Sequence, residues 1–483
     1  MAFAALAACA SEASIPPSTT TTTATSTTGA PSTTTTTTVA LPPPQPIEWV
    51  ACGSGFQCGS VRVPVDYADP ASGTLDLAVV RNPASDPAQR IGSLVVNPGG
   101  PGASGVRRVR RGFAITPEVA TRFDVVGFDP RGIGASAPIG CGATVSAFRA
   151  EDLAPDSPVE AGQLAAAAQA VADECRASEG DRLGHLGTRE GALDVEVIRR
   201  ALGEERISFV GLSYGTLLGL RWAEAYPTSV RALVLDSVVD PQSTSVSASV
   251  NQVESIDDAV AAMDKDCAAT PTCPVSAVGG VGAAYDELAR RLDTGELGAG
   301  GVGPTQLAYA VFSATYGSSR WPELYRALRS GLDGDLAGVA AMARWFTGLV
   351  PYTSFAIVSC LDSPHPSGFE AWQRDADDLA QRSQRFGRIA ANELLPCAFW
   401  PEATSIPHRI TASGAPPALV VGSTGDVATP FDQAVRVARA LARATLLTVE
   451  IDGHIALGAS ACADAAIARY LVDLVVPPDG TRC

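Results

Sequence analysis

The segment around Ser213 constrains the fold of this chain more than any other feature. Residues 207–210 form a short β-prone run, and residues 216–225 form a helix-prone run. Between them lies Gly211-Leu212-Ser213-Tyr214-Gly215, which matches the pattern G-x-S-x-G. The two glycines let a strand and a helix approach closely around a tight turn, and such a turn holds the serine hydroxyl out of the sheet. The segment predicts a strand-turn-helix unit of an α/β sheet, with Ser213 as a nucleophile.

A second glycine-rich turn lies upstream of this segment. Residues 91–96 form an apolar strand that leads into Asn97-Pro98-Gly99-Gly100-Pro101-Gly102. Acyl transfer needs donors for the negative charge that develops on the substrate carbonyl oxygen. We predict that the backbone N–H groups of Gly99, Gly100 and Tyr214 form this oxyanion hole, although an ordinary turn is the alternative. In the next predicted strand and turn, residues 123–134, Asp129 and Arg131 are assigned structural roles.

The general base should follow Ser213 in the chain, because this kind of turn is associated with the order Ser, acid, His. The chain has 4 histidines. His185 precedes Ser213, and His365 and His408 lie beside prolines in apparent loops. His454 follows the predicted strand 446–451 on a turn at its end. We predict that His454 is the general base.

The acid of the site should end the strand that precedes the histidine strand. Asp426 follows the apolar run 418–422, and Thr429-Pro430 then opens a predicted helix, which places Asp426 on a short loop. Asp236, at the end of the predicted strand 232–235, is the alternative acid. The sequence thus predicts a Ser-His-Asp triad that acts through an acyl-enzyme, and it implies no metal or organic cofactor.

Further motifs accompany these residues: Asp129-Pro130-Arg131-Gly132, Leu235-Asp236-Ser237-Val238-Val239-Asp240-Pro241, Gly425-Asp426, Gly453-His454, Ser460-Ala461-Cys462 and Pro478-Asp479-Gly480-Thr481. From about residue 49 to residue 483, the chain resembles the tripeptidyl aminopeptidase family of secreted bacterial serine peptidases, which is related to the prolyl aminopeptidases. Ile455 departs from the pattern, because many relatives carry glycine after the histidine. The resemblance implies an α/β-hydrolase fold with a mainly helical cap domain inserted before the last two core strands.

The spacing of the triad agrees with an inserted cap. The separation of Ser213 from Asp426 far exceeds the length of the intervening strand and helix pairs at about 30 residues per unit. We predict a core formed by 47–241 and 399–483, with a cap at 242–398. Segments 308–315, 321–332 and 369–379 have the spacing of amphipathic helices. Six aromatic residues are assigned to the cap core rather than to the substrate wall: Tyr309, Phe312, Tyr316, Trp345, Phe346 and Tyr352.

The main functional prediction is a serine exopeptidase that cleaves peptide substrates near a free N-terminus. A buried ammonium group needs a carboxylate partner, because an unpaired buried charge costs several kcal/mol. Glu254 and Asp258 share one face of a predicted cap helix and are the candidate amine ligands, with a solvated acidic face as the alternative. A carboxylesterase or lipase-like hydrolase on the same triad, and a catalytically idle surface-binding lipoprotein, are the competing functions.

The N-terminal residues predict export. Residues 1–9 resemble a lipoprotein signal stub, in which the apolar run 2–8 is too short for a bilayer, which needs about 20 residues. Leu6-Ala7-Ala8-Cys9 resembles a lipobox, so Cys9 is the predicted lipidation site, with a chance cysteine as the alternative. Residues 10–46 are rich in Ser, Thr and Pro and predict a disordered tether. We therefore expect a secreted or cell-surface protein whose membrane contact is a lipid at Cys9.

The cysteine content and the net charge indicate the compartment of the protein and exclude one class of partner. Of 11 cysteines, those other than Cys9 are even in number, which indicates disulfides in an exported chain. The net charge of −16 repels phosphate backbones and argues against nucleic acid as a partner. Pairing cysteines that are neighbours in sequence closes only short or moderate loops, and it predicts five disulfides: Cys52–Cys58, Cys141–Cys175, Cys267–Cys273, Cys360–Cys397 and Cys462–Cys483.

Overall fold

The computed structural model describes residues 41–113, 116–297 and 301–483. The predicted lipidation site Cys9 and the predicted tether as far as residue 40 lie outside the described residues. Among the helices of the described residues, none combines the length and the apolar character that crossing a membrane requires.

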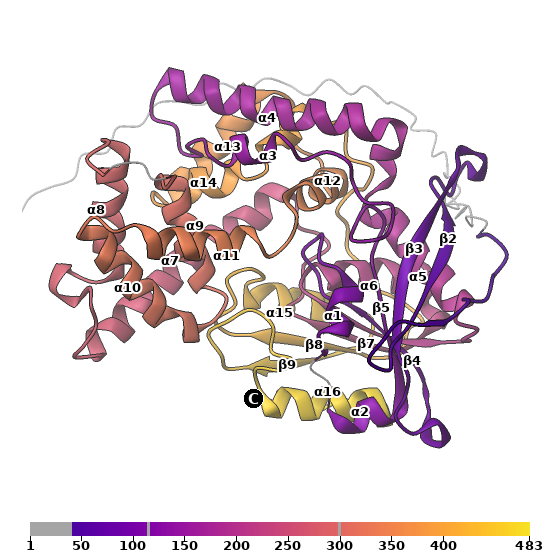
Figure 1. Cartoon of the computed structure of the whole chain (residues 1–483). Helices are drawn as coiled ribbons and strands as arrows, with labels where there is room; N and C mark the ends of the chain where they lie inside the picture. Colours follow the sequence, from indigo (N-terminus) through magenta and orange to yellow (C-terminus); the bar gives the residue numbers. More distant parts are fainter. Residues whose placement is uncertain (1–40, 114–115, 298–300) are drawn as a thin grey trace, which may run out of the picture. The chain divides into compact units, whose positions relative to one another are not determined.

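One mixed sheet forms the centre of the fold (Figure 1). Its spatial order is β1-β2-β3-β5-β4-β6-β7-β8-β9, and the strands from β5 to β9 in that order are parallel. Every residue of β4, β5, β6 and β8 is buried, as expected for parallel strands that are covered on both faces. The strands are β1 (Val50–Ala51), β2 (Gln57–Pro64), β3 (Thr74–Asn82), β4 (Gly92–Asn97), β5 (Phe123–Phe128), β6 (Ile207–Leu212), β7 (Val230–Asp236), β8 (Ala418–Ser423) and β9 (Ala444–Val449).

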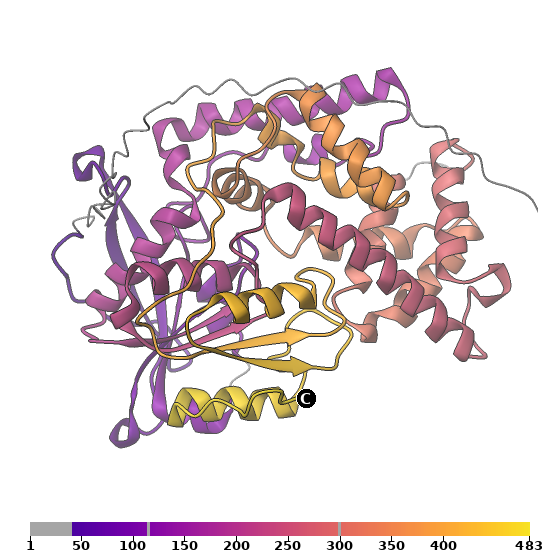
Figure 2. The same cartoon turned by 180° about the vertical axis from the view of Figure 1, so that it is seen from behind.

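Helices cover both faces of this sheet (Figures 1 and 2). One face packs against α1 (Gly105–Arg110), α2 (Pro117–Arg122) and α16 (Ala461–Asp473). The other face packs against α5 (Thr188–Ala201), α6 (Tyr214–Ala225) and α15 (Phe431–Ala440). A separate apolar cluster fills each interface, as expected for a sheet buried between two helical layers. The predicted α/β class is confirmed.

A helical cap interrupts the chain between β7 and β8, as predicted from the resemblance. The predicted amphipathic segments correspond to α9, α10 and α13, which begin and end within a few residues of the expected bounds. The cap helices after β7 are α7 (Ser245–Ala269), α8 (Val281–Asp293), α9 (Pro304–Ala314), α10 (Trp321–Leu332), α11 (Ala337–Thr347), α12 (Tyr352–Asp362), α13 (Phe369–Arg382) and α14 (Gly387–Asn392).

Two helices from an earlier part of the chain also belong with the cap. Helices α3 (Val145–Phe148) and α4 (Pro158–Glu179) lie between β5 and α5 in sequence, and Phe148 and Leu164 are buried in the same cluster as the cap helices. Asn392 Nδ2, at the end of α14, donates to the carbonyl of Leu153 at 2.8 Å and so links the cap to the loop between α3 and α4. Arg176 of α4 donates to the carbonyl of Phe399 at 2.6 Å, and Figure 1 shows α4 on the cap side of the molecule. The segment was predicted as part of the core, but these two helices pack into the apolar cluster of the cap.

The structure contains the five predicted disulfides: Cys52–Cys58, Cys141–Cys175, Cys267–Cys273, Cys360–Cys397 and Cys462–Cys483. The second ties α4 to the loop after β5, and the fourth ties α12 to the 3-10 helix η7 (Leu395–Phe399).

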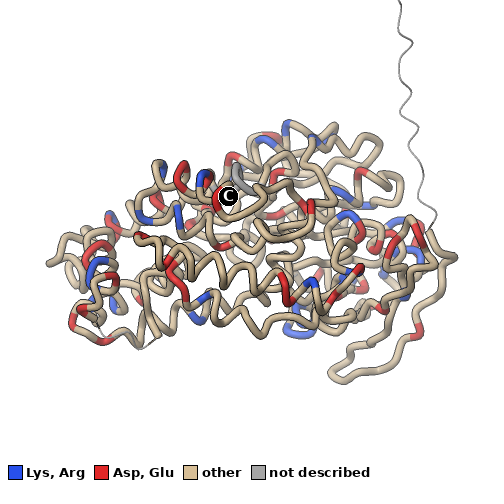
Figure 3. Tube along the Cα trace, turned by 90° about the horizontal axis from the view of Figure 1, so that it is seen from above, with Lys and Arg blue, Asp and Glu red and all other residues tan. Residues whose placement is uncertain are grey.

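Figure 3 shows that acidic and basic residues are interspersed along both the sheet region and the cap.

Candidate active site

Ser213 lies at the turn between β6 and α6, as the G-x-S-x-G pattern predicts. Its backbone has φ 54° and ψ −128°, a conformation that non-glycine residues rarely adopt. The flanking glycines make this turn possible because a Cβ on Gly211 would lie 2.3 Å from the carbonyl oxygen of Gly215. A Cβ on Gly215 would lie 2.5 Å from the carbonyl oxygen of Asn97. Larger residues at either position would force the strand and the helix apart.

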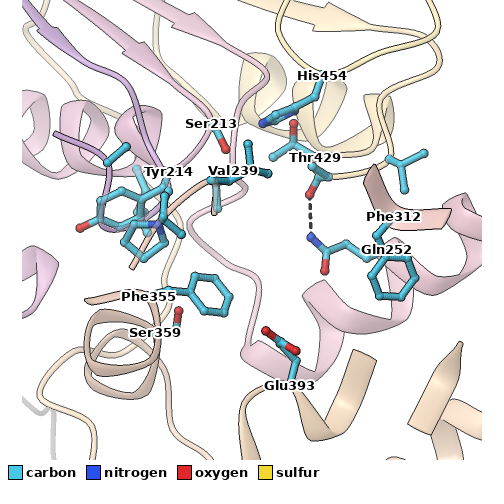
Figure 4. Close-up of a pocket in the computed structure, with 18 of the residues that line it drawn as sticks. Ser213, Tyr214, Val239, Gln252, Phe312, Phe355, Ser359, Glu393, Thr429 and His454 are labelled. Carbon is cyan, nitrogen blue, oxygen red and sulfur yellow. Dashed lines mark hydrogen bonds between the residues drawn. The ribbon is translucent and has the colours of Figure 1, made fainter. Parts of the chain in front are cut away.

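His454 and Asp426 lie on the loops that follow β9 and β8. The Nδ1 atom of His454 is 2.9 Å from each carboxylate oxygen of Asp426. Thr429 donates to the same carboxylate twice, from its backbone N–H and from its hydroxyl, at 2.9 Å each. Asp426 is therefore held by a short loop while it orients the imidazole, and Figure 4 shows that imidazole pointing toward the hydroxyl of Ser213.

The surroundings of His454 favour its protonated form. Burial alone lowers the pKa of His454, but the charge of Asp426 and its hydrogen bond outweigh burial and raise the pKa above 6.5. The ring of Tyr316 meets the imidazole edge-on, with 5.6 Å between centroids. This arrangement suits a base that accepts a proton during the reaction and returns it later.

Asp236, the alternative acid, has a different set of partners. Its carboxylate accepts the backbone N–H groups of Ala456 at 3.1 Å and Leu457 at 2.8 Å. Ser237 accepts the N–H of Ile455 at 2.8 Å. Burial raises the pKa of Asp236 to about 6. The end of β7 thus anchors the loop that carries His454, while Asp426 accepts the hydrogen bond from the imidazole.

The predicted oxyanion hole needs one correction. The N–H of Gly99 donates to the side chain of Asn97 at 3.0 Å, so it is already occupied. Gly100 lines the cavity in front of Ser213. Tyr214 is the first residue of α6, where backbone N–H groups have no partner within the helix. The amides of Gly100 and Tyr214 are therefore the candidate donors. Gly99 has no side chain, which allows the turn to lie against the backbone of Leu212.

A cavity of about 710 Å³ lies between the sheet and the cap, and both Ser213 and His454 line it (Figure 4). Ile455, the residue that departs from the family pattern, also lines it and has φ 77°. Tyr309, Phe312 and Tyr352 are buried in the apolar cluster of the cap, as predicted, but aromatic residues of the cap also contribute much of the cavity wall. Those that line the cavity are Tyr309, Phe312, Tyr316, Trp345 and Phe346.

The predicted amine ligands lie outside this cavity. Glu254 is exposed and pairs with Arg382 at 3.0 Å, and Asp258 is also exposed. Their helix presents this face to solvent, which agrees with the alternative given for them. Two cap carboxylates that sequence reasoning missed, Asp362 and Glu393, line the cavity instead. The available signal for Asp362 was a single acidic residue at the end of an otherwise apolar helix.

Other candidate residues have structural partners. Arg131 forms a buried ion pair with Asp194 at 2.6 Å, and Asp129 accepts the N–H groups of Val106 at 3.1 Å and Ala135 at 3.0 Å. Both agree with the structural roles that were predicted. The three other histidines do not line the cavity. Among the described residues, no group of three or more His, Cys, Asp or Glu side chains is arranged to hold a metal ion.

Comparison with known proteins gives two family matches. Residues 92–278 match the family described as alpha/beta hydrolase fold, and residues 383–483 match the family described as TAP-like protein. The two segments contain Ser213 and the pair Asp426 and His454, respectively.

Three curated relatives cover most of this chain. It is 32% identical to serine protease Hip1 of Mycobacterium tuberculosis, over 91% of each chain. It is 33% identical to tripeptidyl aminopeptidase of Streptomyces lividans, over 83% of this chain and 79% of the relative. It is 34% identical to carboxylesterase B of Mycobacterium tuberculosis, over 88% and 86%. The chain therefore belongs to the α/β-hydrolase family and is a serine hydrolase related to these three proteins.

Proposed function

We propose that this serine hydrolase is an exopeptidase that cleaves short segments from the free N-termini of peptides. The observation that carries the proposal is a partly buried carboxylate, Asp362, in the wall of the cavity that contains Ser213 and His454. A relative named tripeptidyl aminopeptidase supports it, and a relative named carboxylesterase B makes ester hydrolysis the competing function.

Asp362 is suited to a cationic group because its only cationic neighbour among the described residues, Arg221, acts on it through charge without forming an ion pair. Its carboxylate accepts the backbone N–H of Thr188 at 2.9 Å and the hydroxyl of the same residue. Among the described residues, no Lys, Arg or His nitrogen forms an ion pair with it. Burial raises the pKa of Asp362 to about 6, although the hydrogen bonds from Thr188 and the charge of Arg221 lower it. A substrate ammonium group would supply the missing charge, and desolvation would make that pair selective.

Glu393 is less suited to this role, although Figure 4 shows it facing the same cavity. It pairs with Arg149 at 3.1 Å and accepts the hydroxyl of Tyr309. Its charge is therefore already balanced within the protein. We assign Glu393 to the shape and polarity of the cavity wall, and Asp362 to the amine.

The position of Asp362 is consistent with the acyl side of the substrate. Thr188, which donates to Asp362, also shares a hydrogen bond of 2.5 Å with the hydroxyl of Tyr214, the residue after Ser213. Helix α12, which ends at Asp362, places Phe355 and Ser359 on the wall away from His454 (Figure 4). An N-terminal segment could thus extend from the Ser213 hydroxyl toward α12.

The proposed reaction uses the triad that the sequence predicts. The Ser213 oxygen attacks the substrate carbonyl carbon while His454 takes the hydroxyl proton, and Asp426 stabilises the resulting imidazolium. The amides of Gly100 and Tyr214 stabilise the oxyanion. The imidazolium then protonates the leaving amine, the acyl-enzyme forms, and water attacks it with His454 again as the base. A fluorophosphonate probe should label the native protein, and Ser213→Ala should not be labelled.

We further propose that the enzyme acts outside the cell. Five disulfides in the described residues are typical of an oxidising compartment. The Ser/Thr/Pro-rich N-terminal sequence and the lipobox-like Cys9 support a tethered surface protein. Mass spectrometry of the protein from its native membrane fraction would detect a diacylglycerol on Cys9.

Matched chromogenic tripeptide amides, one with a free amine and one N-acetylated, test the substrate class. The native enzyme should prefer the free amine by at least about tenfold in kcat/KM, because the acetylated group cannot pair with Asp362. Asp362→Asn should abolish this preference. Glu254→Gln is the matched control, since that carboxylate is exposed and paired outside the cavity, and it should retain the preference.

Equal cleavage of the two amides by the native enzyme would contradict the exopeptidase proposal. Faster turnover of short-chain esters than of either amide would then favour the carboxylesterase function. A preference that survives in Asp362→Asn but disappears in Glu393→Gln would move the amine site to Glu393.

A further inference from the structure

The arginines that line the cavity differ in how well their charges are satisfied. Arg149 pairs with Glu393 and donates to the carbonyl of Thr347 at 3.3 Å. Arg221 donates to the carbonyl of Ile406 at 3.1 Å and contacts His408. Arg320 is less well satisfied, because its guanidinium group forms no hydrogen bond with the described residues. Its one ion pair in the described residues is with Glu323 at 3.5 Å. Glu323 lies three residues further along the chain, and its side chain is half exposed.

The donors of Arg320 are largely unused. Its Nε atom is buried and has no hydrogen-bond partner in the described structure. The guanidinium group lies 3.8 Å from the centroid of the Trp345 ring, which holds its plane but accepts none of its in-plane hydrogen bonds. Buried polar groups are normally hydrogen-bonded, so a partly buried guanidinium whose one carboxylate neighbour is 3.5 Å away indicates a missing anionic partner.

The position of Arg320 relative to His454 defines which part of a substrate it would meet. The carbonyl of Tyr316 accepts the N–H of His454 at 3.3 Å, and Ser318 donates to the carbonyl of Asp452 at 3.0 Å. Gly317 forms an isolated β-bridge with Gly453. The short 3-10 helix η6 (Ser318–Arg320) that follows is thereby fixed against the histidine loop. Arg320 therefore lies on the histidine side of the cavity.

His454 must protonate the leaving group, so the leaving group occupies that same side. The rim there is open, because Trp345 and Leu349 line the cavity and are also exposed to solvent. Asp362 is connected through Thr188 to Tyr214, and Figure 4 shows Phe355 and Ser359 of α12 away from His454. The cavity thus has a carboxylate without an ion-pair partner on the acyl side and an arginine with few partners on the leaving-group side.

We propose that Arg320 binds a carboxylate on the leaving group, so that the enzyme prefers substrates with a negative charge just beyond the scissile bond. The preference rests on the proposed exopeptidase function as far as the substrates are peptides. The carboxylate can be the C-terminus of a short peptide or an acidic side chain, and the two sources share one recognition chemistry. The planar guanidinium suits either, because it donates two parallel hydrogen bonds to a carboxylate.

Peptides that share one acyl segment and differ only after the scissile bond test this site. The leaving groups are alanine with a free carboxylate, alanine amide, and aspartate amide. The native enzyme should cleave at least one of the two carboxylate-bearing peptides about tenfold better in kcat/KM than the alanine amide. A preference for free alanine identifies the C-terminus as the source, and a preference for aspartate amide identifies the side chain. The preference should fall as salt rises.

Variants assign the preference to Arg320. Arg320→Gln should remove it, and Arg320→Lys should retain part of it, because the charge remains while the planar fork is lost. Arg326→Gln is the matched control, since Arg326 is exposed on the neighbouring helix α10 and does not line the cavity. Because the readout is a ratio of two substrates, partial loss of folded enzyme cancels. Equal cleavage of all three peptides, or a preference unchanged in Arg320→Gln, would overturn the proposal.

An ester pair separates this test from the test of the exopeptidase function. Acyl esters whose leaving alcohol carries either a carboxylate or its amide present the same charge difference without a peptide bond. If the protein cleaves esters but no peptides, the exopeptidase proposal fails, and the ester ratio alone decides whether Arg320 binds the carboxylate. If peptides are cleaved with no charge preference in either pair, the exopeptidase proposal stands and the Arg320 proposal fails.

Discussion

Asp426 decides which nitrogen of His454 faces Ser213. Its carboxylate accepts the proton of Nδ1 and leaves Nε2 free to act as the base. In Asp426→Asn, the side-chain amide can present a donor to Nδ1 and favour the wrong tautomer, so kcat should fall by roughly 10⁴-fold with the fold intact. Steady-state kinetics on the best amide substrate, with circular dichroism to check folding, measures this effect.

Asp236→Asn provides the comparison at the neighbouring position. The carboxylate of Asp236 binds two backbone N–H groups of the histidine loop, and an amide oxygen could accept only part of these bonds. We expect a smaller loss of kcat than in Asp426→Asn. Near-native activity in Asp426→Asn together with inactivity in Asp236→Asn would reverse the assignment of the acid.

The pH dependence of the reaction should report the environment of His454. The imidazole must be neutral to accept the Ser213 proton, and its pKa is raised above 6.5 by Asp426. A raised pKa means that the protonated, inactive form persists to higher pH. For an uncharged substrate, kcat/KM should therefore fall as pH falls through a value above 6.5.

An N-acetylated amide or a neutral ester is the substrate for this measurement. Asp362, whose burial raises its pKa to about 6, would otherwise add the titration of the amine site to the profile. An acid limb centred below 6.5 would show that Asp426 does not stabilise the imidazolium in the free enzyme.

At the level of the elements, the C-terminal tail protects the edge of the sheet next to the histidine loop. Strand β9 is the last strand in the sheet order. The tail pairs with it, since Cys483 donates to the carbonyl of Thr448 at 2.8 Å and Thr448 donates to the carbonyl of Thr481 at 3.2 Å. The disulfide Cys462–Cys483 then ties the tail to α16. An unpaired edge strand would otherwise be exposed.

Loss of this disulfide should destabilise the protein measurably. The double variant Cys462→Ser and Cys483→Ser opens a loop with a sequence separation of 21, which corresponds to about 3 kcal/mol of unfolding free energy. The double variant Cys52→Ser and Cys58→Ser is the comparison, because its separation is only 6 and its effect should be smaller. Denaturant unfolding measures both, and non-reducing peptide mapping checks the pairing. Free thiols at Cys462 and Cys483 in exported protein would contradict the predicted bond.

At the scale of the whole molecule, the cap is assembled from two separate stretches of the chain. The buried side chain of Leu164 on α4 belongs to the same apolar cluster as the helices that follow β7. Leu164→Ala should therefore lower the unfolding free energy by about 2–5 kcal/mol, the usual cost of deleting a buried leucine side chain. Val159 is 70% exposed on the same helix, so Val159→Ala is the matched control and should have little effect.

Denaturant titration of the three proteins measures these differences. Equal stability of Leu164→Ala and the native protein would show that α4 is not part of the cap core. A loss confined to the cap would appear as reduced discrimination between the free and acetylated amides before global unfolding, since the cap supplies Asp362.

Residues close together in sequence account for what could be predicted from the sequence itself. The turn around Ser213 depends on two glycines within five residues, and Asp426 and His454 each follow a recognisable strand. Disulfide pairs between sequence neighbours were correct for the same reason, because short loops limit the possible partners. The family resemblance added the position of the cap, which local patterns alone do not define.

Contacts between distant residues were decided only by the tertiary structure. Thr188 and Asp362 are 174 positions apart, and no local pattern brings the carboxylate to the wall beside Tyr214. The occupied N–H of Gly99 depends on how the side chain of Asn97 folds back, which the Gly-rich pattern does not specify. Glu254 and Asp258 had the correct chemistry but lie on a solvent-exposed face. Helical spacing determines which residues share a face, whereas packing against the rest of the chain determines what that face meets.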